Sequence, residues 1–430
     1  MLEFILSTLM IITMIAAKMF FIFNEGSFSN TGLEVVNLIG LLLLMSVGVI
    51  AYIKLRKSKK HIKTKKNLSI TTIFLFVITG LVVAFSLYLN SIKISLHWDA
   101  IALYEARAKF LAIGMKFSDM SNLSSFDNLN KHYYLLYPPF TSIIHFLWGK
   151  LLAIPISIYY SITLATLLFL SFSVSRYSLG TKGAALLVAL VAANGSIFNV
   201  AIKEYTNLPY DLYLVGGILL LLLHLKTHKL WSFAYGTLLL STSTWIRHLE
   251  PMWLAIVIAY SITILFKDKF KHKIIYILVL TGYCVSEYFI WNHFAIAVGG
   301  RPEAIPTSIL GYVESVLGIF TGAPLVVAKL MVESWSIPFV IHSTALLAAI
   351  LNWKHTIKDK AILFLSLILA ISITFYFAGL YIWSFQVDWW NIIVKSLDRS
   401  SGFLIPVSAY IIIKTLFFSN LYFKKTTLKK

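Results

Sequence analysis

Long uninterrupted apolar runs alternate with short polar segments along almost the whole chain. Each run extends over about 17 to 22 residues, the length that an α-helix needs to cross roughly 30 Å of hydrocarbon. A closed β-barrel would instead show short segments of alternating polarity. The pattern therefore predicts an all-α polytopic membrane protein with about 12 transmembrane helices. The predicted spans are residues 4–23, 33–53, 69–90, 157–175, 183–201, 208–225, 231–247, 251–266, 274–291, 336–353, 361–381 and 402–418.

Composition agrees with this class and excludes a soluble globular domain. Of the 430 residues, 59% are apolar and 13% are charged, whereas about a quarter are charged in soluble domains. The net charge of +19 would suggest a nucleic-acid partner, but the basic residues crowd into short loops. Residues 54–66 are the clearest case, since they hold many lysines and no acid. Such a segment indicates a cytoplasmic loop in contact with anionic lipid, and no nucleic acid is expected.

Placing the basic segments on one side orients the whole chain. Both termini are then cytoplasmic in the plasma membrane, and the active site is on the external face. Residues 139–154 should not cross, because a crossing there would turn five later basic clusters outward. We expect a re-entrant or interfacial helix in that stretch, within an external loop at 91–156. The chain divides into an N-terminal two-helix element with a basic linker at 1–67, a catalytic membrane domain at 68–418 and a basic tail at 419–430.

One polar stretch, residues 97–140, interrupts the apolar pattern on the external face. It begins with His97-Trp98-Asp99, continues as a predicted amphipathic helix ending at Gly114, and closes on Tyr137-Pro138-Pro139. Two further external segments, 292–335 and 382–400, could meet it over one cavity. We therefore regard this stretch as the candidate active site.

Four motifs in this order resemble those of GT-C glycosyltransferases, the bacterial and archaeal relatives of family 39. The motifs are Trp98-Asp99-Ala100 with the following helix and Tyr137-Pro138-Pro139, Glu204-Tyr205-Thr206-Asn207-Leu208-Pro209, Thr244-Trp245-Ile246-Arg247-His248-Leu249-Glu250-Pro251, and Ser396-Leu397-Asp398-Arg399. The resemblance covers residues 70–418 and leaves the first two spans as an extra element. It implies transfer of a sugar from a polyprenyl-phosphate carrier to a glycan, lipid or protein acceptor, with no cofactor besides that donor.

Two departures from the family pattern affect individual roles. Asn207 stands where the family motif has an acid, so a second acidic role would fall to Glu204 or Asp211, or be absent. Arg247 stands where the usual residue is Lys, which keeps the charge and adds a forked donor.

Asp99 is the candidate general base. An acceptor hydroxyl that attacks an anomeric carbon must lose its proton, and a carboxylate beside the membrane can take it. The alternative is that Asp99 caps the helix beginning at Ala100, a role that Asp fills well. The two roles can coexist.

Arg399 and Arg247 are the candidate ligands of the donor phosphate, whose charge develops as the glycosidic bond breaks. An Arg at the outer end of a span can bind a phosphate bidentately. The alternative for both is an ordinary snorkelling or salt-bridged helix end. Lys203 and His248 are weaker companions, and His248 is also interpreted as structural.

Glu105 and Tyr137 are candidate contacts of the acceptor or the sugar, together with Glu204 and His248. Alternatives are a solvated ion pair of Glu105 with Arg107 or Lys109, and interfacial anchoring for Tyr137. The first external loop has no Asp-x-Asp pair and the chain has no His/Cys cluster at metal spacing, so no metal is expected.

Two other functions compete with this one. A lipid-linked saccharide transporter or flippase would place ionisable groups inside the membrane, and the predicted spans are nearly free of charge except for Lys18, Glu287 and Lys414. An external-face polysaccharide polymerase or ligase is the other alternative. The concentration of reactive side chains outside the membrane favours the enzyme.

Overall fold

The computed structural model describes residues 1–26, 28–57, 69–92, 97, 100–120, 137–248, 252–267, 272–298, 323–386 and 394–417. The described part of the chain is helical and contains no β-strand. Its first helices are α1 (Leu2–Glu25), α2 (Phe28–Lys57), α3 (Ile70–Ile92), η1 (Ala100–Glu105), α4 (Ala106–Ala112), α5 (Phe117–Met120), α7 (Phe140–His145) and η2 (Phe146–Leu151). The middle of the chain forms α8 (Ile156–Ala192), α9 (Gly195–Ala201), α10 (Asn207–Thr227), α11 (Leu230–Ser243), α12 (Met252–Lys267) and α13 (Lys273–Ala297). The last described helices are α15 (Ala323–Trp335), α16 (Ile337–Leu351), α17 (Trp353–Lys358), α18 (Lys360–Gln386), α20 (Leu397–Ser400), α21 (Leu404–Ile412) and η4 (Ile413–Phe417).

Within the described ranges, 7 helices are long and apolar enough to cross a membrane. They are α1, α2, α3, α8, α10, α13 and α18. The count rises to 8 if α15 and α16, which are bent by 108° at Ser336, form one broken span. The protein is thus an all-α membrane protein, as the apolar pattern predicts.

Each of the twelve predicted segments overlaps a helix, but several boundaries differ from the prediction. The segments 157–175 and 183–201 fall on α8 and α9, with non-helical backbone at Gly180 and a break at Asn194. The Asn194 side chain accepts hydrogen bonds from the backbone N–H groups of Ser196 and Ile197, which caps α9 and explains the break. The segment 231–247 ends early, because α11 stops at Ser243.

The core of the bundle is α10, whose apolar window is 100% buried. It packs against α8 and α11. A methyl group added at Gly217 would lie 3.1 Å from the backbone nitrogen of Leu240, and one added at Gly236 would lie 3.0 Å from that of Leu221. The two helix backbones therefore approach as closely as small residues allow, which is how helices associate within membranes.

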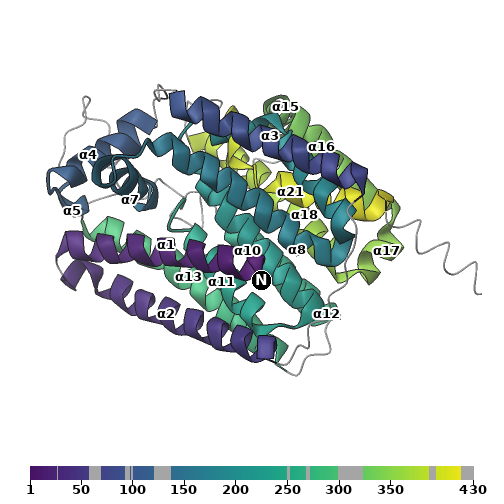
Figure 1. Cartoon of the computed structure of the whole chain (residues 1–430), viewed down its shortest axis with the longest axis horizontal. Helices are drawn as coiled ribbons and strands as arrows, with labels where there is room; N and C mark the ends of the chain where they lie inside the picture. The colour runs from purple at the N-terminus through teal and green to yellow at the C-terminus, as the bar shows by residue number, and fades with distance from the viewer. Residues whose placement is uncertain are drawn as a thin grey trace, which may run out of the picture.

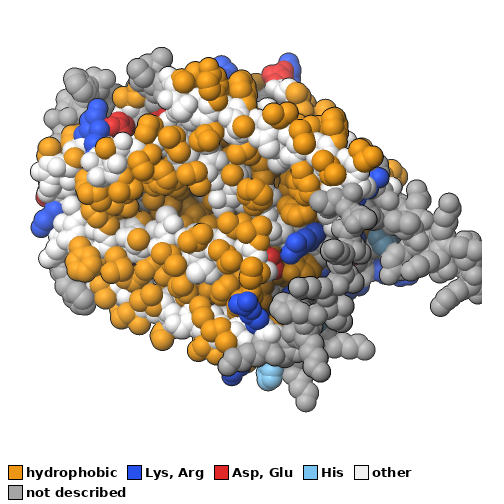
Figure 2. Space-filling view, viewed as in Figure 1, with side chains coloured by type: hydrophobic (Ala, Val, Ile, Leu, Met, Phe, Trp, Pro, Cys, Tyr) orange, Lys and Arg blue, Asp and Glu red, His pale blue; other side chains and the backbone are white. Residues whose placement is uncertain are grey.

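The outer surface of the bundle is strongly apolar. Only 17% of the apolar window of α2 and 11% of that of α3 is buried. Leu43 on α2 is 63% exposed and Leu81 on α3 is 64% exposed. Apolar side chains cover most of the described surface in Figure 2. Such a continuous apolar surface is what a chain in contact with lipid presents.

A group of short helices lies at one end of the bundle. Figure 1 shows α4, α5 and α7 grouped beside one end of α1. Both α5 and α7 contact α1, and η1 contacts α7. This end carries most of the predicted site residues that the structure describes.

Candidate active site

The predicted base, Asp99, lies outside the described residues, as does Trp98. Its role as base or helix cap therefore stays a prediction. The residues on either side of this pair are described. The ring of His97 lies 5.6 Å from the ring of Tyr205, and Ala100 begins η1 and is buried.

The amphipathic helix predicted after Asp99 is present, as η1 followed by α4. It ends before Gly114, whose φ of 82° is a left-handed conformation that glycine adopts readily. The expected pairing of Glu105 with Arg107 or Lys109 is wrong. Glu105 instead pairs with Lys150 at 2.9 Å and approaches His145 at 3.7 Å.

Tertiary packing explains the change of partner, because α7 and η2 lie against η1 and α4 and bring His145 and Lys150 to Glu105. Burial by itself would raise the pKa of Glu105. The interactions with His145 and Lys150 outweigh that effect and lower its pKa to about 2. Glu105 is therefore an ionised structural partner of η2 at neutral pH.

Arg107 is fully buried and joins α4 to the Tyr137-Pro138-Pro139 turn. Its Nη1 donates to the backbone carbonyl of Tyr137 at 3.0 Å, and its guanidinium lies 5.1 Å from the ring centre of Phe117. Tyr137 in turn packs its ring 6.2 Å from that of Tyr104. Arg107 thus holds the two ends of the first motif together.

Thr206 connects α7, which directly follows the first motif, with the third motif. Its hydroxyl accepts a hydrogen bond from the Thr141 hydroxyl at 2.9 Å and donates to the backbone carbonyl of Ile246 at 3.1 Å. Segments far apart in sequence therefore meet at one end of the bundle. Glu204, two residues earlier, is buried and has a φ of 57°. A non-glycine residue in this conformation carries strain of about 1 to 3 kcal/mol, and strain of this kind gathers at functional sites.

A polar pocket of about 300 Å³ lies beside these segments, between α9 and α20. It is lined by three cations and one acid, which gives it a net positive charge. The charged lining residues are Lys203, Lys395, Arg399 and Asp398. Ser196, Asn199 and Ser396 add hydrogen-bonding groups. The lining suits a phosphate-sized anion, which cationic donors bind best.

The backbone around Arg399 is tied to α10. Asn207 Nδ2 donates to the carbonyl of Arg399 at 3.2 Å. The guanidinium of Arg399 lies 4.7 Å from the ring centre of Tyr205. The buried carboxylate of Asp211 accepts the N–H of Phe403 at 2.9 Å. Asn207 therefore positions the backbone of Arg399.

Arg247 and His248 follow the turn that ends α11. His248 is buried, with Nε2 2.9 Å from Asn292 Oδ1 and its ring stacked 4.1 Å from that of Tyr288. Burial lowers the pKa of His248 to about 4, although the hydrogen bond with Asn292 acts in the opposite direction. His248 is therefore neutral at pH 7 and cannot supply positive charge to a phosphate. Arg247 is half-buried.

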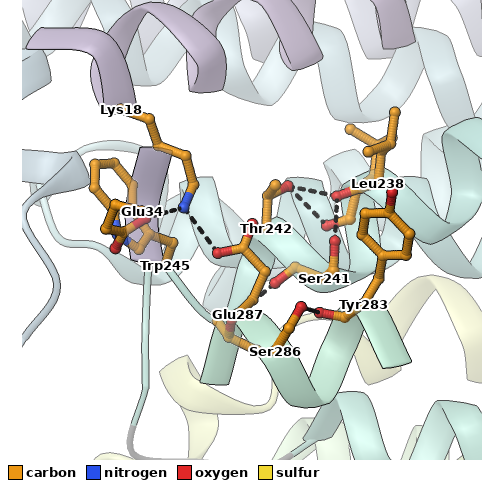
Figure 3. Close-up of polar contacts among 11 residues, drawn as sticks. Lys18, Glu34, Leu238, Ser241, Thr242, Trp245, Tyr283, Ser286 and Glu287 are labelled. Carbon is orange, nitrogen blue, oxygen red and sulfur yellow. Dashed lines mark hydrogen bonds and ion pairs between the residues drawn. The ribbon is translucent and has the colours of Figure 1, made fainter. Parts of the chain in front are cut away.

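The sequence prediction missed a cluster of three buried charges within the apolar helices. Lys18 Nζ lies 2.7 Å from Glu34 Oε2 and 2.8 Å from Glu287 Oε2 (Figure 3). Glu34 was not recognised as an exception to the charge-free spans. The available signal was one isolated charge in each of three apolar runs, which is rare in spans unless the charges pair or act.

A scan against protein-family models and searches of characterised proteins and of solved structures found no match. Among the described residues, no group of three or more His, Cys, Asp or Glu could hold a metal ion. The class of the protein therefore rests on its fold alone. It is an all-α membrane protein with 7 candidate spans in the described ranges.

Proposed function

We propose that this protein is a GT-C glycosyltransferase that moves a sugar from a polyprenyl monophosphate to an acceptor on the external face of the plasma membrane. The observation that carries this proposal is the position of Tyr205. Its ring contacts His97, two residues before Asp99, and also the guanidinium of Arg399 in the cationic pocket. His97, two residues before the candidate base in sequence, and the candidate phosphate site thus share Tyr205 as a neighbour.

The chemistry is a direct displacement. Asp99 accepts the proton of the acceptor hydroxyl as its oxygen forms a bond to the anomeric carbon. The bond from that carbon to the phosphate oxygen breaks, and the phosphate leaves with the electron pair. Arg399, with Lys203 and Lys395 in the same pocket, stabilises the charge that develops on this phosphate. Arg247 is the second candidate for that role.

The membrane arrangement of the proposal has twelve spans, cytoplasmic termini and a re-entrant segment at 139–154. The helices in that segment support it, since α7 and η2 together cover only residues 140–151, about 18 Å of helix. In a Cys284→Ser background, we expect His132→Cys and Ile156→Cys both to react with an impermeant thiol reagent from outside. Labelling of position 156 only after permeabilisation would overturn this topology.

The donor site is tested with Arg399→Ala and Arg399→Lys. Loss of charge-assisted hydrogen bonds worth about 1.5 to 3 kcal/mol should weaken binding of a polyprenyl-phosphate sugar roughly 10- to 100-fold in the Ala variant. The Lys variant keeps the charge and should be intermediate. The matched control is Lys182→Ala, an exposed cation in a predicted cytoplasmic segment. Normal donor affinity in Arg399→Ala would move the role to Arg247.

The base is tested with Asp99→Asn and radiolabelled sugar transfer by the purified protein. An amide cannot accept the proton, yet Asn caps a helix about as well as Asp. Correctly inserted protein without turnover is the expected result. Asp99→Ala removes both functions, with about 1 kcal/mol of helix stability, and does not separate them. Substantial transfer by Asp99→Asn would leave this residue as a cap.

A lipid-linked saccharide flippase is the second candidate, and the buried charge cluster of Lys18, Glu34 and Glu287 favours it. Transporters place paired ionisable groups inside the bundle. Purified protein in liposomes containing a radiolabelled polyprenyl-phosphate sugar separates the two functions. An enzyme yields a glycosylated product when an acceptor is present, whereas a flippase yields only lipid accessible from the opposite side. A polymerase or ligase would instead consume a diphosphate-linked oligosaccharide.

A further inference from the structure

Three candidate spans meet at one buried ionic cluster, formed by Lys18 of α1, Glu34 of α2 and Glu287 of α13. The side chains of these three residues are 0%, 1% and 0% exposed. The ammonium of Lys18 bridges the two carboxylates at 2.7 and 2.8 Å and also lies 4.7 Å from the ring centre of Trp245 (Figure 3). Trp245 Nε1 donates to Glu34 Oε1 at 3.0 Å. Both oxygens of Glu34 therefore have donors.

Glu287 differs from Glu34 in this respect. Its Oε2 accepts from Lys18, but its buried Oε1 has no hydrogen-bond partner among the described residues. Asn37, one turn after Glu34 on α2, lies close enough for its amide group to interact with the carboxyl group of Glu287, although no hydrogen bond reaches Glu287 Oε1 or Asn37 Oδ1 within the described ranges. Two acceptor oxygens without donors thus lie in one buried site.

The charge count points to what is missing. One ammonium and two carboxylates carry a net charge of −1, and an uncompensated charge is expensive inside a membrane. One further positive charge makes the cluster neutral. A metal cation needs several oxygen ligands, whereas the described cluster leaves only Glu287 Oε1 and Asn37 Oδ1 without donors. A proton needs one acceptor, and on Glu287 Oε1 it also supplies a donor.

We propose that the cluster is a proton-binding site within the membrane, in which Glu287 carries one exchangeable proton beside the ion pair of Lys18 and Glu34. The charged groups that face Glu287 in the described structure are Lys18 from α1 and Glu34 from α2. On its own helix the buried Cys284 lies close enough to interact electrostatically with Glu287. From the turn that follows α11 the cluster receives the indole of Trp245. In the packed helix α12 the ionisable side chains are Lys267, at its end, and Tyr260, which packs against Phe364.

A groove between α2 and α13 adjoins the cluster through Asn37. Asn37 also lines a groove of about 910 Å³ between α2 and α13. Ser286, Asn292 and His293 give this groove further polar groups. Because Asn292 also contacts His248, the groove reaches the turn that follows α11. In this proposal the proton exchanges by way of Asn37 and this groove.

Infrared spectroscopy tests the proposal directly, because a protonated carboxyl group and a carboxylate absorb at different frequencies. The protein is measured at neutral pH in a maltoside detergent, which has no ester carbonyl. The spectrum of Glu287→Gln minus wild type should show loss of one carboxylic-acid band, which shifts in deuterium oxide. Gln has the shape of a neutral acid, so this variant should fold. Glu333→Gln, at an exposed position on α15, is the matched control and should leave the band unchanged.

Charge balance gives a second, independent readout. In Glu34→Gln, Glu287 should ionise to pair with Lys18, so the acid band is lost although Glu287 is present. In Lys18→Met both carboxyls should be protonated, and the band should about double. The double variant Lys18→Met with Glu34→Gln should restore the wild-type intensity, which also controls for misfolding of either single variant.

Two results would overturn the proposal. One is loss of a carboxylate band in place of an acid band in Glu287→Gln. The other is stabilisation of the wild type by sodium ions that Glu287→Gln lacks, which would assign the balancing charge to a metal cation. Neither readout involves sugar transfer, so its outcome is independent of the proposed function.

Discussion

Replacing Lys18 with Met should destabilise the protein severely, because it removes the only cation that two buried carboxylates contact at under 3 Å in the described structure. Met fills the space of the aliphatic stem, so lost packing contributes little. What remains is the electrostatic change. Breaking a buried ion pair typically costs about 3 to 5 kcal/mol, since it leaves an uncompensated charge.

An independent estimate gives the same magnitude. Without Lys18, the carboxylate of Glu34 must take up a proton to remain buried. For a carboxyl with an ordinary pKa near 4.3, protonation at pH 7 costs about 3.7 kcal/mol, at 1.36 kcal/mol per unit. At pH 5 the same step costs only about 1 kcal/mol. The destabilisation should therefore shrink by roughly 2.7 kcal/mol as the pH falls from 7 to 5.

The free energy of unfolding can be measured by titrating mixed micelles with dodecyl sulfate and following tryptophan fluorescence at both pH values. The matched control is Lys329→Met on α15, where the side chain is 77% exposed and its partner Glu333 lies 3.9 Å away. An exposed i,i+4 pair contributes about 0.5 kcal/mol or less. A loss in Lys18→Met no larger than in this control, or one that does not depend on pH, would refute the reasoning.

Two further predictions concern packing and charge at the candidate site. Gly402→Ala should lower the free energy of unfolding by about 1 to 3 kcal/mol, because the added Cβ overlaps the buried carboxylate of Asp211; Gly80→Ala, where nothing lies within 4 Å, is the control and should be neutral or stabilising. The lowered pKa of Glu105, about 2, means that its pairing with Lys150 stabilises the protein above the unfolded pKa near 4.3 and is lost as the pH falls toward 2. Glu105→Gln should lack that part of the acid destabilisation, and superimposable acid-unfolding profiles of the variant and the wild type would contradict this assignment.

Local patterns were enough to predict the elements near the site. The helix after Asp99 ends two residues before Gly114. Gly114 adopts a positive φ, which glycine does readily, so a glycine in the sequence is a signal for the end of a helix. The short helices of residues 140–151 also follow from prolines at 138, 139 and 155. The ion-pair partners of the side chains near the site were not predictable in the same way. Glu105 lies four residues from Lys109 and 45 from Lys150, yet the pair forms with Lys150.

The sequence by itself determined the class of the protein and its helical content. Hydrophobic length and basic loops are summed along the chain, so they need no knowledge of neighbours. Only the tertiary structure decided which charges meet. Lys18, Glu34 and Glu287 lie on three different helices. In the sequence, each of them is an isolated charge in an apolar run. Interactions between charges weaken with distance, and the distances depend on how the helices pack. The cluster and the pocket around Arg399 therefore become visible only in the tertiary structure.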